Sequence, residues 1–189
     1  MSSLENTFNE AKKLHNLGKI RQAQELYEKI LKIRNDNFLI FNLYATTFLQ
    51  LKKFNKAIEN FSKSINLNPS FADNFNNRGI AYAEVKNYKM AISDYDQAIN
   101  LKKNYFNAYL NKAIALSNYG KFNESISCFN ICIKINPSDP KIYNSLGNLY
   151  AKIDNLEQSL KAYDKAINLK KDFDIAYSNR GDIRLKQKK

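Results

Sequence analysis

The sequence has little of what catalytic and metal sites are built from. Its 189 residues include one histidine, two cysteines and no tryptophan. His15 has no second histidine with which to bind a metal, and we expect it at the surface of the first helix. Cys128 and Cys132 have no third soft ligand near them in sequence, so we expect structural thiols. No phosphate loop, nucleophile elbow or paired-carboxylate motif is present. We therefore expect a protein that is not an enzyme and needs no metal or cofactor.

Long apolar runs and targeting signals are also absent. The longest apolar stretch, residues 38–51, is interrupted by Asn42, Thr46, Thr47 and Gln50, so we expect no membrane span. The first residues lack the basic and apolar regions of a secretory signal. With three prolines, five glycines and 44% hydrophobic residues, the composition indicates a folded chain. We predict a cytoplasmic protein.

Arginine is scarce although the chain is strongly basic. The net charge is +12, yet only five of the thirty basic residues are arginine. Arginine is favoured where a protein holds phosphate through two parallel hydrogen bonds. Lysine combined with abundant asparagine is instead typical of AT-rich genomes, which explains the charge without a partner. RNA binding is therefore the third of our hypotheses, and we expect no nucleic-acid partner.

What the sequence does contain is a period of 34 residues. Aromatic side chains recur at this spacing without insertion or deletion: Tyr27, Phe61, Tyr95, Phe129 and Tyr163. Small residues keep the same spacing in two further series: Ala23, Ala57, Ala91, Ser125 and Ser159, and Ala11, Ala45, Gly79, Ala113, Gly147 and Gly181. A fixed period of this length predicts stacked units that cannot bury their apolar faces alone.

Each period contains two helical patterns. Between 72 and 105, apolar and small residues recur at steps of three and four on both sides of a break at Lys86-Asn87, which predicts an antiparallel pair of helices. Equivalent breaks occur at Gly18-Lys19, Lys52-Lys53, Gly120-Lys121 and Asp154-Asn155. Pro69 and Pro137 are expected after second helices and Pro140 at the start of a first helix. Mid-helix Gly79 and Gly147 indicate close helix contact, because glycine otherwise costs about 1 kcal/mol there.

This pattern resembles the tetratricopeptide repeat. The residues that carry the resemblance are Phe75, Arg78, Gly79, Tyr82, Ala91, Tyr95 and Ala98. The resemblance implies an all-α, right-handed α-solenoid of antiparallel helix-turn-helix repeats. We predict five repeats, at 4–37, 38–71, 72–105, 106–139 and 140–173. Residues 174–189 match the first helix of a sixth repeat, as a capping helix or, as we favour, because the chain is a fragment of a longer array.

One pair of residues is expected to form a contact between helices. Arg78 and Asp94 lie sixteen residues apart, and the equivalent pair in a later repeat, Leu146 and Ala162, is apolar. We therefore predict an ion pair between Arg78 and Asp94. Arg180 would need an acid sixteen residues further on, where the chain has no residue.

The resemblance also implies that first helices line a concave groove. The predicted peptide-binding residues are Asn9, Lys12, Asn42, Asn76, Asn77, Asn107, Asn111, Asn144, Asn148 and Asn179. Asparagine both donates and accepts hydrogen bonds, so a row of asparagines can pair with the backbone of an extended peptide. We predict a protein-interaction scaffold that binds an extended peptide or partner helix. The alternative is the substrate-recruiting part of a longer enzyme, such as a glycosyltransferase.

Overall fold

The fold is that of a computed structural model, which describes residues 3–187. Met1, Ser2, Lys188 and Lys189 lie outside the described residues, so the last two residues of the predicted segment 174–189 are not described. Between residues 3 and 187 the chain forms eleven α-helices and no strand. It divides into two compact units, Met1–Lys103 and Asn104–Lys189, which are described separately.

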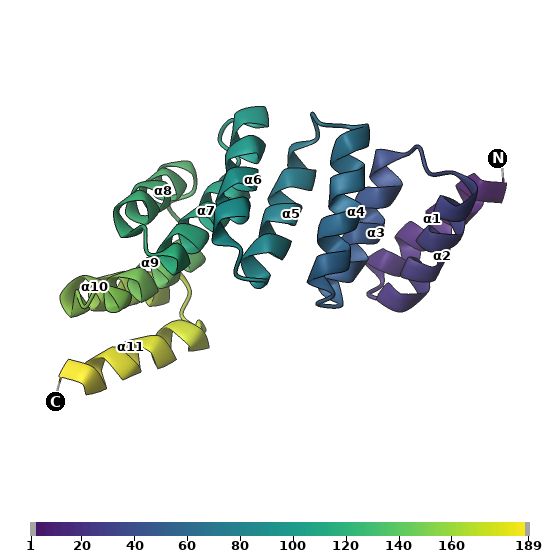
Figure 1. The fold of residues 1–189 in the computed structure, drawn as a ribbon. Coiled ribbons are helices and arrows are strands. Elements are labelled where there is room, and N and C mark those ends of the chain that lie inside the picture. Colours follow the sequence, from purple (N-terminus) through teal and green to yellow (C-terminus); the bar gives the residue numbers. More distant parts are fainter. Residues whose placement is uncertain (1–2, 188–189) are drawn as a thin grey trace. The chain divides into compact units, whose positions relative to one another are not determined.

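The described part of the first unit consists of three helical hairpins, coloured purple to teal in Figure 1. Within a hairpin, two helices run antiparallel and pack along their length. Neighbouring hairpins meet through α2 and α3 and through α4 and α5. The helices are α1 (Ser3–Asn16), α2 (Ile20–Ile33), α3 (Phe38–Gln50), α4 (Phe54–Leu67), α5 (Ala72–Glu84) and α6 (Tyr88–Leu101).

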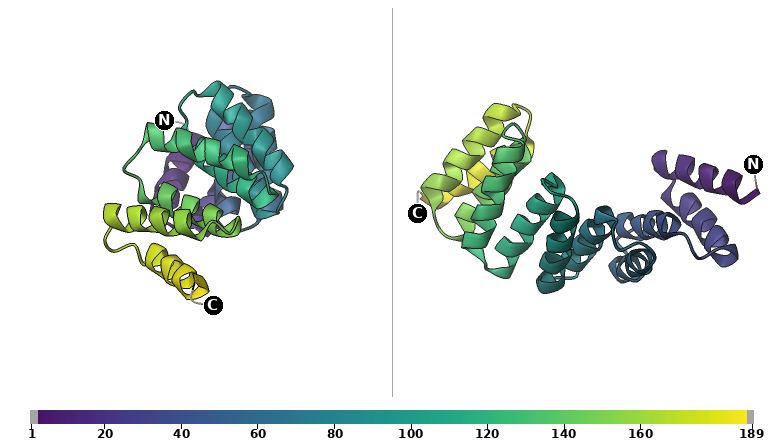
Figure 2. Two further views of the ribbon diagram at one scale, coloured as in Figure 1. Left: turned by 90° about the vertical axis from the view of Figure 1, so that its left-hand side faces the viewer. Right: turned by 90° about the horizontal axis from the view of Figure 1, so that it is seen from above.

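The second unit contains two further hairpins and, within the residues described, one additional helix. The helices are α7 (Phe106–Tyr119), α8 (Phe122–Ile135), α9 (Pro140–Lys152), α10 (Leu156–Leu169) and α11 (Asp174–Gln187). Helix α11, drawn in yellow, packs against α10 of the preceding hairpin (Figures 1 and 2). Each of the helices α7, α9 and α11 lies at the start of its 34-residue period. Helix α9 contacts both α7 and α11.

The turns within the hairpins lie where the sequence predicted them. Their first predicted residue has a positive φ in every copy, from 57° to 89°: Gly18, Lys52, Lys86, Gly120 and Asp154. This left-handed conformation ends a helix and reverses the chain within a few residues. The proline predictions are also confirmed, since Pro69 and Pro137 follow α4 and α8 and Pro140 is the first residue of α9.

The aromatic series forms the centre of the core in both units. All five rings are at most 2% exposed: Tyr27, Phe61, Tyr95, Phe129 and Tyr163. Fully burying one such side chain contributes about 1.5–3 kcal/mol. The residues that precede these rings by four positions are fully buried as well: Ala23, Ala57, Ala91, Ser125 and Ser159. The 34-residue period therefore marks the positions where two helices pack most closely.

Two serines of this series also link the helices of a hairpin by hydrogen bonds. Ser125 Oγ donates to the carbonyl oxygen of Ala113 at 2.7 Å, and Ser159 Oγ donates to that of Gly147 at 2.9 Å. The acceptors are twelve residues earlier, on the first helix of the same hairpin. A buried hydroxyl group is satisfied in this way without disturbing the packing of the small residues.

The predicted ion pair between Arg78 and Asp94 is confirmed. Arg78 Nε and Nη2 each lie 2.8 Å from an oxygen of the Asp94 carboxylate, while Nη1 donates to Ser62 Oγ at 2.9 Å. The guanidinium carbon is 5.8 Å from the ring centroids of Phe75 and Tyr82. Arg78 thus connects α5 to α6 of its own hairpin and to α4 of the preceding one.

Our expectation for Arg180 is corrected by the structure. The sequence placed the expected partner sixteen residues after Arg180, but Arg180 pairs with Asp164, sixteen residues before it. Ser62 likewise lies sixteen residues before Arg78 and accepts a hydrogen bond from it. An arginine at this position of a first helix can therefore reach the second helix on either side.

Candidate functional site

The predicted peptide-binding residues lie on the odd-numbered helices, at positions that we call the first-helix face. In the first unit, α1 carries Asn9 and Lys12, α3 carries Asn42, and α5 carries Asn76 and Asn77. In the second unit, α7 carries Asn107 and Asn111, α9 carries Asn144 and Asn148, and α11 carries Asn179. These side chains differ widely in how much of their surface meets solvent.

In the first unit, two of these residues are buried. Asn42 is 7% and Asn76 is 4% exposed. Asn42 Nδ2 donates to Asn74 Oδ1 at 2.7 Å, and Asn76 Nδ2 donates to Asn77 Oδ1 at 3.1 Å. Their hydrogen-bonding groups are used inside the protein. Asn9 and Lys12 are exposed on α1, so they present more surface to a ligand.

In the second unit, three predicted residues come together. Asn179 Nδ2 donates to Asn144 Oδ1 and to Asn148 Oδ1, both at 3.1 Å. Tyr163 Oη also donates to Asn148 Oδ1, at 2.6 Å. Burial raises the pKa of Tyr163 above its ordinary value, which keeps this hydroxyl group protonated and able to donate. The oxygen of Asn148 thus accepts two hydrogen bonds.

These bonds fix the orientation of the Asn148 amide. Because Oδ1 is held by Tyr163 and Asn179, Nδ2 is the end of the amide that remains for a ligand. Nδ2 has no hydrogen-bond partner among residues 3–187, and the side chain is exposed. Asn148 therefore presents a donor to a carbonyl oxygen of a ligand.

A pocket of about 290 Å³ opens beside Asn148. Helices α7, α8 and α9 form its walls, through Ile114, Ser117, Asn118, Phe129, Ser145 and Asn148. Two of these residues, Ile114 and Phe129, are apolar, and the others carry hydroxyl or amide groups. Next to the pocket, Lys152 Nζ donates to the Ser117 carbonyl oxygen at 2.8 Å and contacts Asn118 Oδ1 at 3.4 Å.

The prediction from sequence did not include the apolar residues of this face. Ile114 is 39%, Ile175 is 61% and Leu185 is 64% exposed. Ile114 on α7 and Ile175 on α11 occupy first-helix-face positions, since they are equivalent to Asn148 and Asn107, and Leu185 lies near the end of α11. An apolar residue at such a position in the sequence could have identified this part of the surface, but the prediction rested on amides and charged residues alone.

The histidine and the two cysteines, the other residues considered from the sequence, have structural roles. His15 is partly buried, with Nε2 3.0 Å from Gln50 Oε1 and Nδ1 3.5 Å from Tyr27 Oη. Cys128 and Cys132 are buried free thiols. In the part of the chain that the structure describes, no group of three His, Cys, Asp or Glu side chains could hold a metal ion.

No helix between residues 3 and 187 is a candidate for crossing a membrane. None of the described helices combines the length and the apolar character that crossing a bilayer requires.

Solved structures of other proteins share this fold. A tetratricopeptide repeat protein from Parabacteroides merdae ATCC 43184 superimposes with a TM-score of 0.85 at 24% identity, covering 97% of this chain and 72% of that one. MamA from Desulfovibrio magneticus RS-1 gives 0.83 at 15% identity, covering 92% and 98%. YrrB, described as a TPR protein with an unusual peptide-binding site, gives 0.76 at 22% identity, covering 93% and 90%. No curated protein matches the sequence.

Sequence-family models cover most of the chain. The model of the N-terminal TPR repeats region of Psidin matches residues 80–177, a TPR repeat model matches 45–86, and a tetratricopeptide repeat model matches 8–37. Together with the helical hairpins, these matches confirm the all-α solenoid class that the sequence predicted. The chain belongs to the tetratricopeptide repeat family.

Proposed function

We propose that this protein is an interaction scaffold, with a binding rather than a catalytic role, that holds an extended peptide on the first-helix face of its second unit. The observation that carries the proposal is the pocket between α7 and α9, where the Asn148 Nδ2 donor lies beside exposed Ile114. Such a site offers hydrogen bonds to a peptide backbone and an apolar contact to one side chain.

The size of the pocket favours a peptide over a cofactor. At about 290 Å³ it is just below the range of roughly 300–1,000 Å³ for small-molecule sites. It suits a single side chain of a longer ligand that continues along the helices. Asn107 and Asn111 on α7, and Asn144 and Asn179 beside Asn148, extend the polar surface in the directions such a ligand could follow.

The same mode of binding is proposed for the exposed residues of the first unit. Asn9 and Lys12 on α1 and half-buried Asn77 on α5 are the predicted residues there with solvent-accessible surface. Asn42 and Asn76 would act indirectly, by holding neighbouring side chains in place. The description of YrrB as a peptide-binding TPR protein supports binding of this class.

Selection from a random peptide library, followed by affinity measurement, tests the proposal. The peptide that binds most tightly to the wild type is labelled and titrated with Asn148→Ala, with Ile114→Asn and with Asn130→Ala. Asn130 is an exposed amide of α8 outside the pocket, so it is the matched control. We expect each pocket variant to weaken binding by roughly tenfold, since each removes about 1–1.5 kcal/mol of contact.

Two outcomes would contradict the proposal. One is a library selection that enriches no peptide for the wild-type protein. The other is an enriched peptide whose affinity is the same for all three variants. Thermal unfolding of each variant controls for Asn148→Ala, which also removes the acceptor of Tyr163 and Asn179.

A further inference from the structure

The turn between α3 and α4 carries an unusual concentration of positive charge. A pocket of about 390 Å³ is lined there by Lys52, Lys53, Phe54, Asn55, Lys56 and Val85. We call it the lysine-turn pocket. It belongs to the first unit, lies at the ends of the helices, and shares no residue with the first-helix-face site proposed above.

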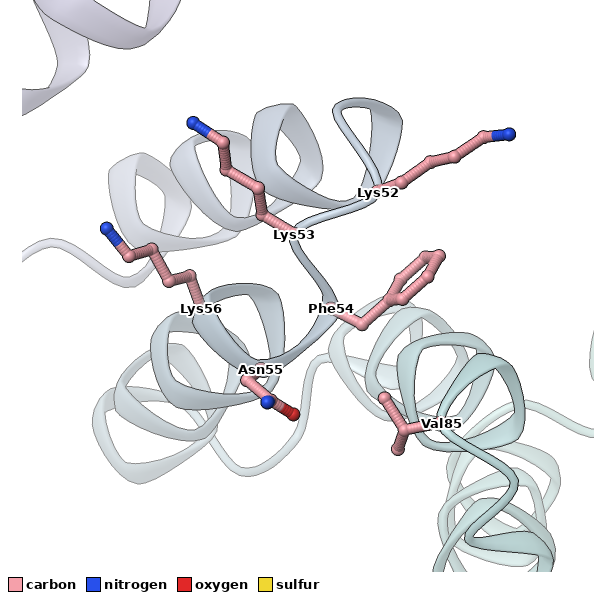
Figure 3. A pocket seen from close by; sticks show the side chains of 6 residues that line it. All are labelled: Lys52, Lys53, Phe54, Asn55, Lys56 and Val85. Atoms are coloured by element: carbon pink, nitrogen blue, oxygen red, sulfur yellow. The ribbon is translucent and has the colours of Figure 1, made fainter.

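The interior of the lysine-turn pocket is apolar and its edge is cationic. Figure 3 shows the ring of Phe54 and the side chain of Val85 beside the same opening, with Lys52 extending above Phe54. Lys53 and Lys56 extend to the other side of the turn. Val85, at the end of α5, is 40% exposed, which is high for a residue of its type.

The three ammonium groups are not neutralised by the protein. No carboxylate of residues 3–187 lies within ion-pair distance of Lys52, Lys53 or Lys56. The three lysines therefore provide positive potential close to exposed apolar surface. An apolar centre with a polar edge is also the usual anatomy of a protein interface.

We propose that the lysine-turn pocket docks an acidic segment of a partner protein, with one aliphatic or aromatic side chain of that segment inserted between Phe54 and Val85. Carboxylates on either side of the inserted residue then pair with Lys52 on one side of the turn and with Lys53 and Lys56 on the other. Charge complementarity selects the acidic segment, and the apolar insertion fixes its register.

The residue types favour a peptide over a nucleic acid. Phosphate recognition favours arginine, which forms two parallel hydrogen bonds, and the pocket contains lysine only. The ammonium groups point to different sides of the turn (Figure 3). They do not form the continuous row that suits a phosphate backbone. An apolar side chain of a peptide can fill the space between Phe54 and Val85.

The second unit contains a natural comparison at the equivalent turn. A smaller pocket, of about 290 Å³, is lined there by Gly120, Lys121, Phe122, Asn123 and Glu124, each 68 residues after its counterpart from Lys52 to Lys56. Phenylalanine and asparagine are retained, but two of the three lysines are replaced. The remaining Lys121 forms an ion pair with Glu124, Nζ to Oε1 at 2.8 Å. The charge of the first-unit pocket is therefore not a requirement of the turn itself.

The test uses a short fluorescein-labelled peptide of aspartate and glutamate with one central leucine, titrated with the full chain. Two variant peptides accompany it, one with glycine in place of leucine and one with amides in place of the acids. We expect Lys52→Glu/Lys56→Glu to weaken binding of the first peptide by at least roughly tenfold. Val85→Asn should weaken it less, and should not change the affinity for the glycine peptide. The amide peptide should bind poorly to every variant.

Control variants separate a pocket from a general charge effect. Lys13→Glu/Lys29→Glu makes the same change of charge on exposed residues of α1 and α2 in the same unit. We expect this variant to bind the acidic peptide within about twofold of the wild type. The proposal is overturned if it loses as much affinity as the pocket variant, or if the leucine and glycine peptides bind equally. Tighter binding of single-stranded RNA with the same dependence on Lys52 and Lys56 would replace the peptide by nucleic acid.

Discussion

Gly79 lies directly against the ring of Tyr95. A β-carbon at residue 79 would be 2.7 Å from Cε1 and 2.9 Å from Cδ1 of that ring, which is closer than non-bonded carbon atoms approach. Gly147 has the same relation to Tyr163, with a distance of 2.5 Å to Cε1. The close contact that mid-helix glycines predicted is confirmed, and it is a contact with the aromatic residue of the facing helix.

Gly79→Ala should therefore destabilise the protein. Tyr95 is 1% exposed and cannot move aside, so the new methyl group forces the helices apart. Overpacking of this kind costs about 1–3 kcal/mol, more than the helix propensity gained. Urea denaturation followed by circular dichroism measures the change. Gly181→Ala is the control, because no atom beyond its chain neighbours and its own helix backbone lies within 4 Å of the added β-carbon, and it should stabilise the protein by up to about 1 kcal/mol. Equal effects of the two substitutions would contradict this interpretation.

Removing one partner of the Arg78 ion pair should cost more than removing both. The side chains of Arg78 and Asp94 are 16% and 4% exposed. Asp94→Ala leaves a mostly buried guanidinium group without its carboxylate, and we expect a loss of about 3 kcal/mol in the free energy of unfolding.

The double variant Arg78→Leu/Asp94→Ala reproduces the apolar pair found at Leu146 and Ala162. It should unfold within about 1 kcal/mol of the wild type, because no charge remains unpaired. Chemical denaturation of the two single variants and the double variant forms a thermodynamic cycle. If the double variant is as unstable as the sum of the single ones, the two side chains are not coupled.

The buried asparagines Asn42 and Asn74 should make the first unit less stable than apolar residues at the same positions would. Asn74 is fully buried and its Nδ2 has no hydrogen-bond partner among the described residues, while its Oδ1 accepts from Asn42. Replacing both by apolar residues, Asn42→Leu/Asn74→Ile, should raise the free energy of unfolding by about 1–2 kcal/mol.

Isoleucine already occupies the position equivalent to Asn74 in two other repeats, at Ile40 and Ile142. The single substitution Asn74→Ile should instead destabilise by about 1–3 kcal/mol, because the Asn42 amide loses its acceptor. Thermal unfolding of the single and double variants distinguishes the two directions. A stabilising single variant would show that the hydrogen bond to Asn42 contributes nothing.

Cys132 should make the protein sensitive to alkaline pH. Burial raises the pKa of this thiol from 9.0 to about 12, because the charged thiolate is disfavoured in the core. The unfolded chain releases the proton at the lower pKa, so the contribution of Cys132 to stability is complete below pH 9.0 and is lost as pH rises toward about 12. Urea denaturation across this range should show a smaller decline for Cys132→Ala than for the wild type. Parallel curves would contradict the assignment, and the tyrosines common to both proteins cancel in the comparison.

The thiols should also be unreactive in the folded protein. Both cysteines are buried, and a protonated thiol is a poor nucleophile. Labelling with iodoacetamide at neutral pH should become fast only in denaturant. Rapid labelling under native conditions would indicate that α8 opens readily.

The sequence by itself determined which residues form the hairpins and their core. A helix buries side chains at three- and four-residue steps, and a constant 34-residue period repeats the same burial in every hairpin, so Tyr27, Tyr95 and the turn at Lys52 could be placed without coordinates. The ion pair of Arg78 with Asp94 was predictable for the same reason, because both residues belong to one hairpin.

Only the tertiary structure decided which polar groups remain for a ligand. Periodicity does not show which residue of a neighbouring helix supplies a hydrogen-bond partner. That information distinguishes Asn42, which is buried and bonded to Asn74, from Asn148, which is exposed and whose amide is oriented by Tyr163 and Asn179. Arg180 was assigned the wrong direction for the same physical reason, since its partner Asp164 lies on the preceding hairpin. Contacts within a repeat follow from local spacing, whereas contacts between repeats depend on how the hairpins stack.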